Sequence, residues 1–345
     1  MRFVKSVSGR VTMKDVADYA NVSISTVSYV LNGNGPVSQA RKKSVEQAIE
    51  ALNYIPNESA RGLKLQVSST IGLVVPGLEN QFFSVLARGV VQAASAKNRL
   101  VVFCSAETSE EAEYGIARLL SSKRVDGVIY ESDFQESRES LLELQSLGPV
   151  VLVDERIPGI DLPAVVADGR RGARDIATHM INLGHRKISC VTGPDGHWTA
   201  EQRLAGYREG LALGGIHPDA MEVIAGDYRM NSGYEAAKLL LLRPKSDRPT
   251  VLMCSNDLMA IGALEFCRAE GIDVPGDVSI TGFDDIPFAN LLTPRLTTAR
   301  QPALEMGREA ADLLIKLIDG EIESAVRSPY PVDLVVRDST GEPSR

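Results

Sequence analysis

The sequence predicts a small all-α head followed by a larger α/β body whose parallel sheets form two lobes. Three observations support this prediction. The chain has 345 residues, which is too long for one small core. Residues 1–63 read as short helices separated by breakers. From residue 70 onward, apolar strands alternate with amphipathic helices, which is typical of parallel sheets, and these units are more numerous than one sheet comfortably holds.

Two helices joined by a tight turn are predicted at the start of the head. Thr12 is placed to cap the first helix, and Asp15 completes a pattern like a capping box. Asn21 can adopt the left-handed backbone that a tight turn needs. Ser23 then caps the second helix, which ends at the Asn/Gly/Pro breaker in residues 32–36.

A third helix is predicted after Ser38, which is placed to cap it. One face of this helix is apolar and carries Val45, Ala48, Ile49 and Leu52. Pro56-Asn57 ends the unit, and a short fourth segment spans residues 57–63.

The spacing of small and apolar residues in the first two helices is that of a helix-turn-helix. Ala17 is small where two helices must cross closely, Asn21 lies at the turn, and Val27 packs back onto the first helix. The second helix begins with small and hydroxyl side chains at residues 23–26, which suit contacts to phosphates and base edges. A purely structural helical bundle is the alternative for this pattern alone.

The charge distribution also separates head from body. The chain has 37 Lys/Arg and 45 Asp/Glu, for a net charge of −8. Residues 1–70 contain nine Lys/Arg against five Asp/Glu, so this segment is +4 and the remainder is −12. A basic head on an acidic body is the distribution expected of a phosphate-binding head.

Other classes of protein are disfavoured. No apolar run approaches the ~20 residues of a membrane span, and the first residues lack the apolar region of a secretory signal. The four cysteines and four histidines show no metal-ligand spacing, so we expect a reduced cytoplasmic chain without a metal or cofactor. An enzyme is disfavoured because the chain has no phosphate loop, nucleophile elbow or His-Glu-x-x-His motif.

The body is predicted to contain nine strands, mostly separated by helices such as residues 83–96, 110–121 and 172–183. Their apolar composition predicts strands buried on both faces. The strand candidates are residues 71–75, 100–104, 127–130, 150–153, 164–167, 188–192, 222–225, 251–254 and 278–281. Since ligands of open parallel sheets bind beyond the carboxyl ends of the strands, two facing lobes would form a cleft there.

Several motifs, in order, resemble the LacI/GalR repressor family. The head motifs are Val11–Ala17, Val22-Ser23, Thr26–Ser28, Leu31-Asn32 and Leu52–Asn57 with Ala60 and Leu63. The body motifs are Leu183–Ile188, Arg203–Tyr207, Asn256-Asp257, Gly282–Asp285, Leu296–Thr298 and Leu334–Arg337. The resemblance covers roughly residues 11–340, and an ordered set is far more specific than a single motif. It disfavours the structural-bundle alternative.

The resemblance implies contacts of the head with DNA. It assigns backbone contacts to Thr12, Ser23, Thr26, Ser28, Asn32, Ser38, Tyr54 and Asn57. It assigns base reading to Ile24, Ser25 and Tyr29. Two residues depart from the family pattern, because Asn21 stands where Gly is commoner and Tyr29 where Arg is usual.

By the same resemblance, residues 57–63 form a hinge helix with Ala60 and Leu63 on DNA, and Leu63 wedges between base steps in the minor groove. The implied layout is a helix-turn-helix domain at 1–56, a hinge and linker at 57–69, and an effector-binding and dimerisation body at 70–345. A homodimer on near-palindromic operator DNA is expected. The C-terminal end shows no leucine heptad of the kind that makes some members tetramers.

The body of this family is similar to periplasmic sugar-binding proteins, which implies a sugar-like effector between the lobes. The effector-binding candidates are Phe82, Phe83, Ser132, Asp133, His197, Trp198, Arg203, Tyr228, Asn256 and Asp284. Aromatic faces can stack on sugar rings, and Arg or Asp can hold pairs of hydroxyls. The expected function is an effector-controlled repressor, with an activator as the alternative. A periplasmic sugar-binding protein without a DNA role is less consistent, since it would need an export signal and no basic head.

Overall fold

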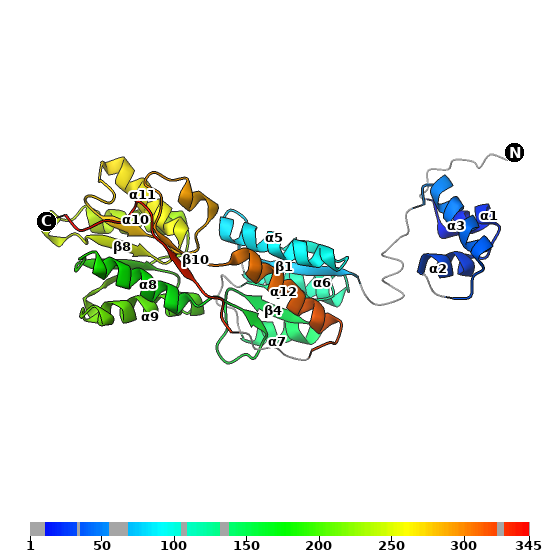
Figure 1. The fold of residues 1–345 in the computed structure, drawn as a ribbon. Helices are drawn as coiled ribbons and strands as arrows, with labels where there is room; N and C mark the ends of the chain where they lie inside the picture. The colour runs from blue at the N-terminus through cyan, green and yellow to red at the C-terminus, as the bar shows by residue number, and fades with distance from the viewer. Residues whose placement is uncertain are drawn as a thin grey trace. The chain divides into compact units, whose positions relative to one another are not determined.

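The computed structural model describes residues 11–32, 35–54, 68–104, 109–131, 138–322 and 328–344. The chain divides into two compact units between Ser68 and Ser69 (Figure 1). We call the first unit the head and the second the body. Most of the predicted hinge lies outside the described residues, so the boundaries 1–56, 57–69 and 70–345 remain a prediction.

The head contains three helices in its described part, and the predicted capping box begins the first. The helices are α1 (Met13–Ala20), α2 (Ile24–Asn32) and α3 (Gln39–Ala51). The Thr12 hydroxyl accepts a hydrogen bond from the Asp15 N–H, and the Asp15 carboxylate accepts one from the Thr12 N–H at 2.7 Å. These bonds satisfy donors that a helix N-terminus otherwise leaves open.

The structure agrees with the sequence prediction for the turn and for one of the two remaining helix caps. Asn21 has φ 51°, the left-handed conformation predicted for the turn. The Ser23 hydroxyl accepts from the Thr26 N–H at 3.2 Å and so caps α2. Ser38 occupies the N-cap of α3, but its side chain makes no cap hydrogen bond there. The prediction for Ser38 was therefore right in position and wrong in contact.

A small apolar core joins the three helices of the head. The buried members of this core are Val16, Ala17, Val27, Val45, Ala48 and Tyr54. Ala17 and Val27 are both buried, as the helix-turn-helix spacing predicts. A core this small makes the head sensitive to any polar substitution in it.

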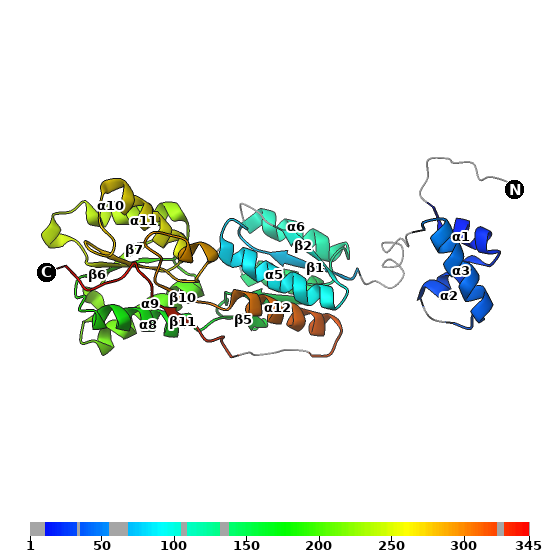
Figure 2. The same ribbon diagram turned by 45° about the horizontal axis from the view of Figure 1, so that its top comes forward.

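The first lobe of the body is a five-stranded parallel sheet with helices on both faces (Figures 1 and 2). The strands in spatial order are β2 (Leu100–Cys104), β1 (Thr70–Val74), β3 (Val128–Tyr130), β4 (Val150–Val153) and β5 (Ala164–Val165). The helices are α5 (Gln81–Ala96), α6 (Ser109–Ser121), α7 (Arg138–Leu147) and α12 (Ala303–Ile318). Because strand side chains alternate between faces, Leu73 packs in one apolar cluster with α5 and α12, whereas Val74 packs in the other with α6 and α7.

The second lobe repeats this architecture with four parallel strands. Their spatial order is β7 (Glu222–Ala225), β6 (Ile188–Thr192), β8 (Val251–Cys254) and β9 (Ser279–Thr281). The helices are α8 (Gly169–Asn182), α9 (Trp198–Leu213), α10 (Met230–Leu241) and α11 (Asp257–Glu270), with short 3-10 turns at Pro218–Ala220, Lys245–Asp247 and Pro287–Asn290. The helices pack in two pairs, α8 with α9 and α10 with α11.

A short antiparallel pair beside the second lobe was not predicted. It consists of β10 (Thr298–Arg300) and β11 (Asp333–Val335). The segment between these two strands contains α12, which belongs to the first lobe and packs on α5 and against β3, β4 and β5. Each strand has three residues, too few to show a recognisable alternation in the sequence.

Two of the predicted strands are not buried on both faces. β2 and β7 each lie at one edge of their sheet, and their residues are exposed or half-buried. Leu100 is 67 % exposed and Phe103 is 42 % exposed. The expectation of full burial was wrong for these two strands. The opposite edge strands, β5 and β9, are buried, and other segments of the chain bond to the backbone there, at Tyr330 and Ser339.

In the part of the chain that the structure describes, no helix combines the length and apolar character that crossing a membrane requires. Within the same residues, no group of three or more His, Cys, Asp or Glu side chains is arranged to hold a metal ion. The four cysteines are free thiols, and three of them are buried.

Candidate functional site

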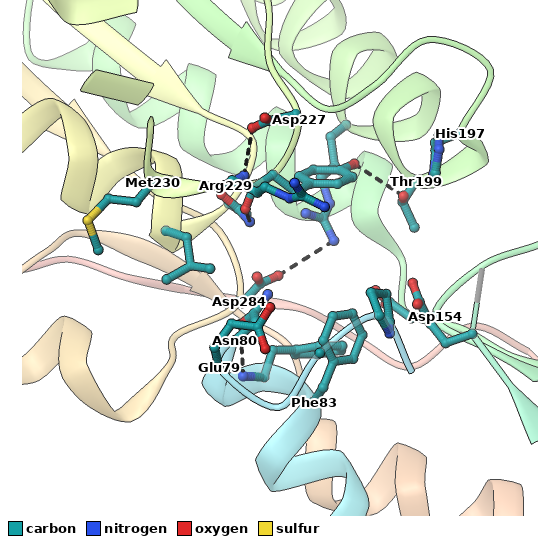
Figure 3. Close-up of a pocket in the computed structure, with 18 of the residues that line it drawn as sticks. Glu79, Asn80, Phe83, Asp154, His197, Thr199, Asp227, Arg229, Met230 and Asp284 are labelled. Carbon is teal, nitrogen blue, oxygen red and sulfur yellow. Dashed lines mark hydrogen bonds and ion pairs between the residues drawn. The ribbon is translucent and has the colours of Figure 1, made fainter. Parts of the chain in front are cut away.

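A cavity of about 800 Å³ lies between the two lobes, at the carboxyl ends of the strands (Figure 3). Figure 3 shows Glu79, Asn80 and Phe83 of the first lobe on the opposite side from Asp227 and Arg229 of the second. The lining residues are Pro76, Gly77, Glu79, Asn80, Phe82, Phe83, Glu131, Asp154, His197, Thr199, Arg203, Asp227, Tyr228, Arg229, Met230, Asn231, Asn256, Leu258 and Asp284. Its position agrees with the rule for open parallel sheets.

Most of the predicted effector-binding residues meet in this cavity. Seven of them line it: Phe82, Phe83, His197, Arg203, Tyr228, Asn256 and Asp284. Ser132 and Asp133 lie outside the described residues. Trp198 lines a second cavity of about 340 Å³, where the Arg156 guanidinium carbon lies 5.9 Å from its ring centroid. The prediction for Trp198 is corrected, because its side chain packs among apolar residues of the first lobe.

Arg203 is the buried cation of the cavity. Its guanidinium lies 3.5 Å from an Asp284 carboxylate oxygen, and it also donates a hydrogen bond to the Ser255 carbonyl. The guanidinium carbon lies over the Phe283 ring, 4.2 Å from its centroid, and 5.6 Å from the Tyr228 ring centroid. These contacts compensate the guanidinium for the loss of its hydration on burial.

Asp284 follows strand β9, and two side chains contact the same oxygen of its carboxylate. The Gln301 amide donates to Oδ1 at 2.8 Å, and the Arg203 guanidinium lies 3.5 Å from that atom. Its φ of 115° is rare for a residue other than glycine. Burial raises the pKa of Asp284 to about 7, although the nearby Arg203 charge acts in the other direction. The carboxyl group can therefore accept or donate hydrogen bonds near neutral pH.

Asp154 is a buried carboxyl group that the sequence reasoning missed. It follows strand β4, and its Oδ1 atom has no hydrogen-bond partner among the described residues. Burial raises the pKa of Asp154, and Arg203 and Gln301 oppose this shift. Its place after a buried strand is the same signal that singled out Ser132 and Asp133 after the preceding strand.

Asn256 positions other groups of the cavity. Its amide oxygen accepts from the Met259 N–H at 2.9 Å and caps α11, while its amide nitrogen donates to the Tyr228 carbonyl at 2.8 Å. Tyr228 has φ 62°, and its hydroxyl lies 3.2 Å from the Thr199 hydroxyl. Asn256 therefore positions Tyr228, and its amide still has a second N–H group that can donate.

A buried polar contact joins the lobes beside the cavity. The Glu155 carboxylate of the first lobe accepts hydrogen bonds from Thr199 of the second, at 2.9 Å from the hydroxyl and 3.3 Å from the N–H. The His197 ring lies 3.8 Å from the same carboxylate. Burial raises the pKa of Glu155 to about 7, and it lowers the pKa of His197.

Glu155→Gln is expected to remove a loss of stability that the unsubstituted protein undergoes as pH rises. The free energy of unfolding of the variant, minus that of the unsubstituted protein, should therefore increase with pH. Between the ordinary carboxyl pKa and about 7, folded Glu155 keeps a proton that the unfolded chain has released. The stability of the unsubstituted protein therefore falls as pH rises through this window, on the order of 2–3 kcal/mol between about pH 5 and 8 for this group alone.

Urea denaturation of both proteins across this pH range measures the difference. Glu201→Gln on the exposed side of α9 is the matched control and should show no such trend. A Glu155→Gln difference that is constant with pH would contradict the assignment.

The exposed surface of α2 in the head carries the predicted base-reading residues. Ile24 is 49 % exposed and Tyr29 is 47 % exposed, and Ser25 is also exposed. The Ser23 hydroxyl lies 2.7 Å from that of Ser25 and 2.9 Å from that of Thr26. This surface presents hydroxyl groups beside apolar and aromatic side chains.

The Tyr29 ring has a defined place at the end of α2. Gly35 has φ 105°, and a Cβ atom built there would lie 2.7 Å from the ring. The glycine therefore allows the ring to lie against the turn. The sequence singled out Tyr29 but not this supporting residue.

The other predicted DNA-contacting residues of the head divide into three groups. Ser38 is exposed and Ser28 half-buried. The Thr12 hydroxyl is exposed but already engaged by Asp15 at 2.6 Å, and Tyr54 is 7 % exposed because its ring belongs to the core of the head. The side chain of Asn32 and all of Asn57, Ala60 and Leu63 lie outside the described residues.

Two protein-family models match the chain. The model described as bacterial regulatory proteins, lacI family, matches residues 12–57, and the periplasmic binding protein-like domain matches residues 177–340. The first match covers the helix-turn-helix of the head. The second covers most of the second lobe together with α12 and β11.

Similar proteins match over nearly the whole chain. The HTH-type transcriptional repressor CytR of Escherichia coli K12 is 34 % identical over 95 % of this chain and 96 % of its own length. The ribose operon repressor of the same strain is 38 % identical over 89 % of this chain and 93 % of its own. The crystal structure of a lac repressor dimer bound to operator and the anti-inducer ONPF has a TM-score of 0.84 at 29 % identity, and the match covers 96 % of this chain and 100 % of that one.

Proposed function

Because the chain belongs to the lacI family of bacterial regulatory proteins, we propose that it is a dimeric repressor whose affinity for a near-palindromic operator is set by a sugar-like effector between the lobes. The family establishes a transcription regulator with a DNA-binding helix-turn-helix, and not an enzyme. The operator, the dimer and the effector are the proposed parts.

The exposed surface of α2 is the observation on which the operator proposal rests. Its hydroxyl groups can donate to phosphate oxygens, and Ile24 offers an apolar contact for a thymine methyl. Tyr29, where the family usually has Arg, can offer a ring and one hydroxyl but no bidentate contact to guanine. We therefore expect an operator that differs from those of Arg-bearing members at the base pair facing Tyr29.

The outer strand β2 supports the proposed dimer. Leu100, Val102 and Phe103 are partly exposed along this strand, although apolar edges of this kind are usually covered. A second copy of the chain is the occupant that the lac repressor dimer suggests. A two-fold dimer would also present two heads to the two halves of a palindrome.

The chemistry of the cavity supports a polyhydroxylated effector. Arg203 and Asp284 can bind adjacent hydroxyl groups, and the free Oδ1 of Asp154 can accept another from the first lobe. Phe82 and Phe83 form an edge-to-face pair with centroids 5.2 Å apart at the N-terminus of α5, where an apolar sugar face can pack. One relative is the ribose operon repressor, so ribose is the first effector to test.

Effector binding can act on the DNA through closure of the lobes. Asp154 belongs to the first lobe, and Arg203 and Asp284 belong to the second, so a ligand that contacts all three favours one relative arrangement of the lobes. Differential affinity for that arrangement shifts the equilibrium, and the coupling to operator affinity is reciprocal.

Selection from random DNA duplexes tests the proposal. We expect the purified chain to enrich a near-palindromic site, with an affinity that falls steeply as salt rises and changes in the presence of a sugar. Tyr29→Ala should relax the preference at one position of each half-site, at a cost of about 1–2 kcal/mol. Tyr19→Ala is the matched control, because Tyr19 is 61 % exposed on α1 and outside the reading surface. Failure to enrich any site, with and without sugars, would refute the proposed repressor.

A further inference from the structure

We propose that the effector is an uncharged polyol and that the cavity rejects phosphorylated and carboxylated sugars. This inference rests on the proposed sugar-like effector and narrows it to one chemical class. Two features of the cavity support it: an excess of carboxyl groups, and helix N-termini at which side-chain oxygens of the protein already accept hydrogen bonds.

The described lining of the cavity contains more acidic than basic side chains. Its carboxyl groups are Glu79, Glu131, Asp154, Asp227 and Asp284, and its guanidinium groups are Arg203 and Arg229. Arg203 is already engaged by Asp284, by the Ser255 carbonyl and by two aromatic rings. Arg229, Glu79 and Asp227 are all exposed, so water screens their charges. Among the buried groups, an added anion would lie beside three carboxyl groups, Glu131, Asp154 and Asp284, and a single guanidinium that is already engaged.

Helix N-termini are the places where a fold of this kind binds anions, through free backbone N–H groups. In three helices beside the cavity, an oxygen of the protein already accepts from the first turn. Asn80 Oδ1 accepts from the Phe82 N–H of α5 at 3.0 Å. Asn256 Oδ1 accepts from the Met259 N–H of α11, and the Glu155 carboxylate accepts from the Thr199 N–H of α9. At each of these helix ends, a side-chain oxygen therefore already takes one of the N–H groups that a phosphate would use.

Helix α10 differs from these three helices, and a carboxylate lies next to its N-terminus. Its N-cap, Arg229, makes no side-chain cap hydrogen bond. The Asp227 carboxylate accepts from the Arg229 N–H at 2.9 Å (Figure 3). The N-cap of α9, His197, likewise makes no cap hydrogen bond, but the Glu155 carboxylate occupies that helix end. The start of α10 is next to the negative charge of Asp227, and Asp227 is the residue that we assign to excluding a phosphate there.

Hydroxyl groups suit the unpaired atoms that remain. Asp154 Oδ1 and Arg203 Nε are buried without hydrogen-bond partners among the described residues. A hydroxyl can donate to the first and accept from the second, whereas a phosphate can only accept near neutral pH when fully ionised. A neutral polyol therefore satisfies both atoms without adding charge.

Calorimetry on the full chain with matched pairs of ligands tests the inference. The pairs are ribose with ribose 5-phosphate and glucose with glucose 6-phosphate. We expect at least one parent sugar to bind, and its phosphate ester to bind about tenfold or more weakly, since the buried carboxyl groups of the lining repel a further anion. An ester that binds as tightly as its parent would overturn the inference. Binding of neither member of any pair would instead overturn the proposed sugar-like effector.

Asp227→Asn tests the assignment of the excluding residue. We expect the affinity for the ester, divided by that for the parent sugar, to rise up to about fivefold, because Asp227 is exposed and partly screened. Asp219→Asn is the matched control, an exposed aspartate of the same lobe that does not line the cavity. An unchanged ratio in Asp227→Asn, or an equal rise in Asp219→Asn, would overturn the assignment.

Discussion

Arg203→Met is expected to abolish the response to effector while binding of operator without effector persists. The substitution keeps much of the side-chain volume but removes the donors that face the cavity. It also leaves Asp284 buried beside Gln301 without its cation. Breaking a buried ion pair in this way costs about 3–5 kcal/mol of stability when the remaining group stays charged.

The cost to Arg203→Met should depend on pH. Asp284 already has its pKa raised to about 7 by burial, and loss of the nearby cation raises it further. Up to about pH 7 both proteins keep a proton on Asp284, and the variant avoids most of the penalty. Above that pH only the variant must keep the proton, so its loss of stability is larger at about pH 8 than at about pH 6.

Denaturation at both pH values, with calorimetry and operator-binding anisotropy, measures these effects. Arg208→Met is the matched control, because Arg208 is exposed on the same helix α9 and does not line the cavity. Normal effector binding by Arg203→Met would show that the cavity between the lobes is not the effector site.

Val27→Asp is expected to unfold the head, abolish operator binding and leave effector binding intact. Val27 is fully buried between the helices of the head. A charged group there costs several kcal/mol, whereas a core of this size supplies only about 3–5 kcal/mol in total. The body forms a separate compact unit with its own cores, so it should remain folded.

Limited proteolysis, operator anisotropy and effector calorimetry distinguish the two units. Ile24→Asp is the matched control, because Ile24 lies in the same helix but is 49 % exposed. It should leave the head resistant to protease even if base contacts are lost. Loss of effector binding in Val27→Asp would contradict the separation of head and body.

The head was predictable because its signals are local. The bond between Thr12 and Asp15 spans three residues, and the left-handed turn at Asn21 depends on that residue's own side chain. The apolar strands of the body were likewise readable, and strands such as β4 and β8 begin and end where the sequence indicates. The pair β10–β11 was not predicted because it joins two three-residue segments that are separated in the sequence by α12.

The cavity was predictable only in part. Strand ends and family motifs pointed to Arg203 and Asp284, which do meet. Trp198 and Thr199 are neighbours at the start of α9, yet only Thr199 lines the main cavity. Successive helix positions point about 100° apart, so a shift of one residue moves a side chain from one cavity to the other. Sequence spacing at a loop-to-helix junction does not specify that direction.

Local order along this chain is enough to define its helices, its alternation of strands and its positively charged first segment, because each depends on residues within a few positions of one another. The convergence of Asp154, Arg203 and Asp284 has a different origin, since they come from separate lobes and from positions up to 130 apart in the chain. Packing alone brings them together and excludes water from them. That exclusion raises the carboxyl pKa values and leaves polar atoms open to a ligand.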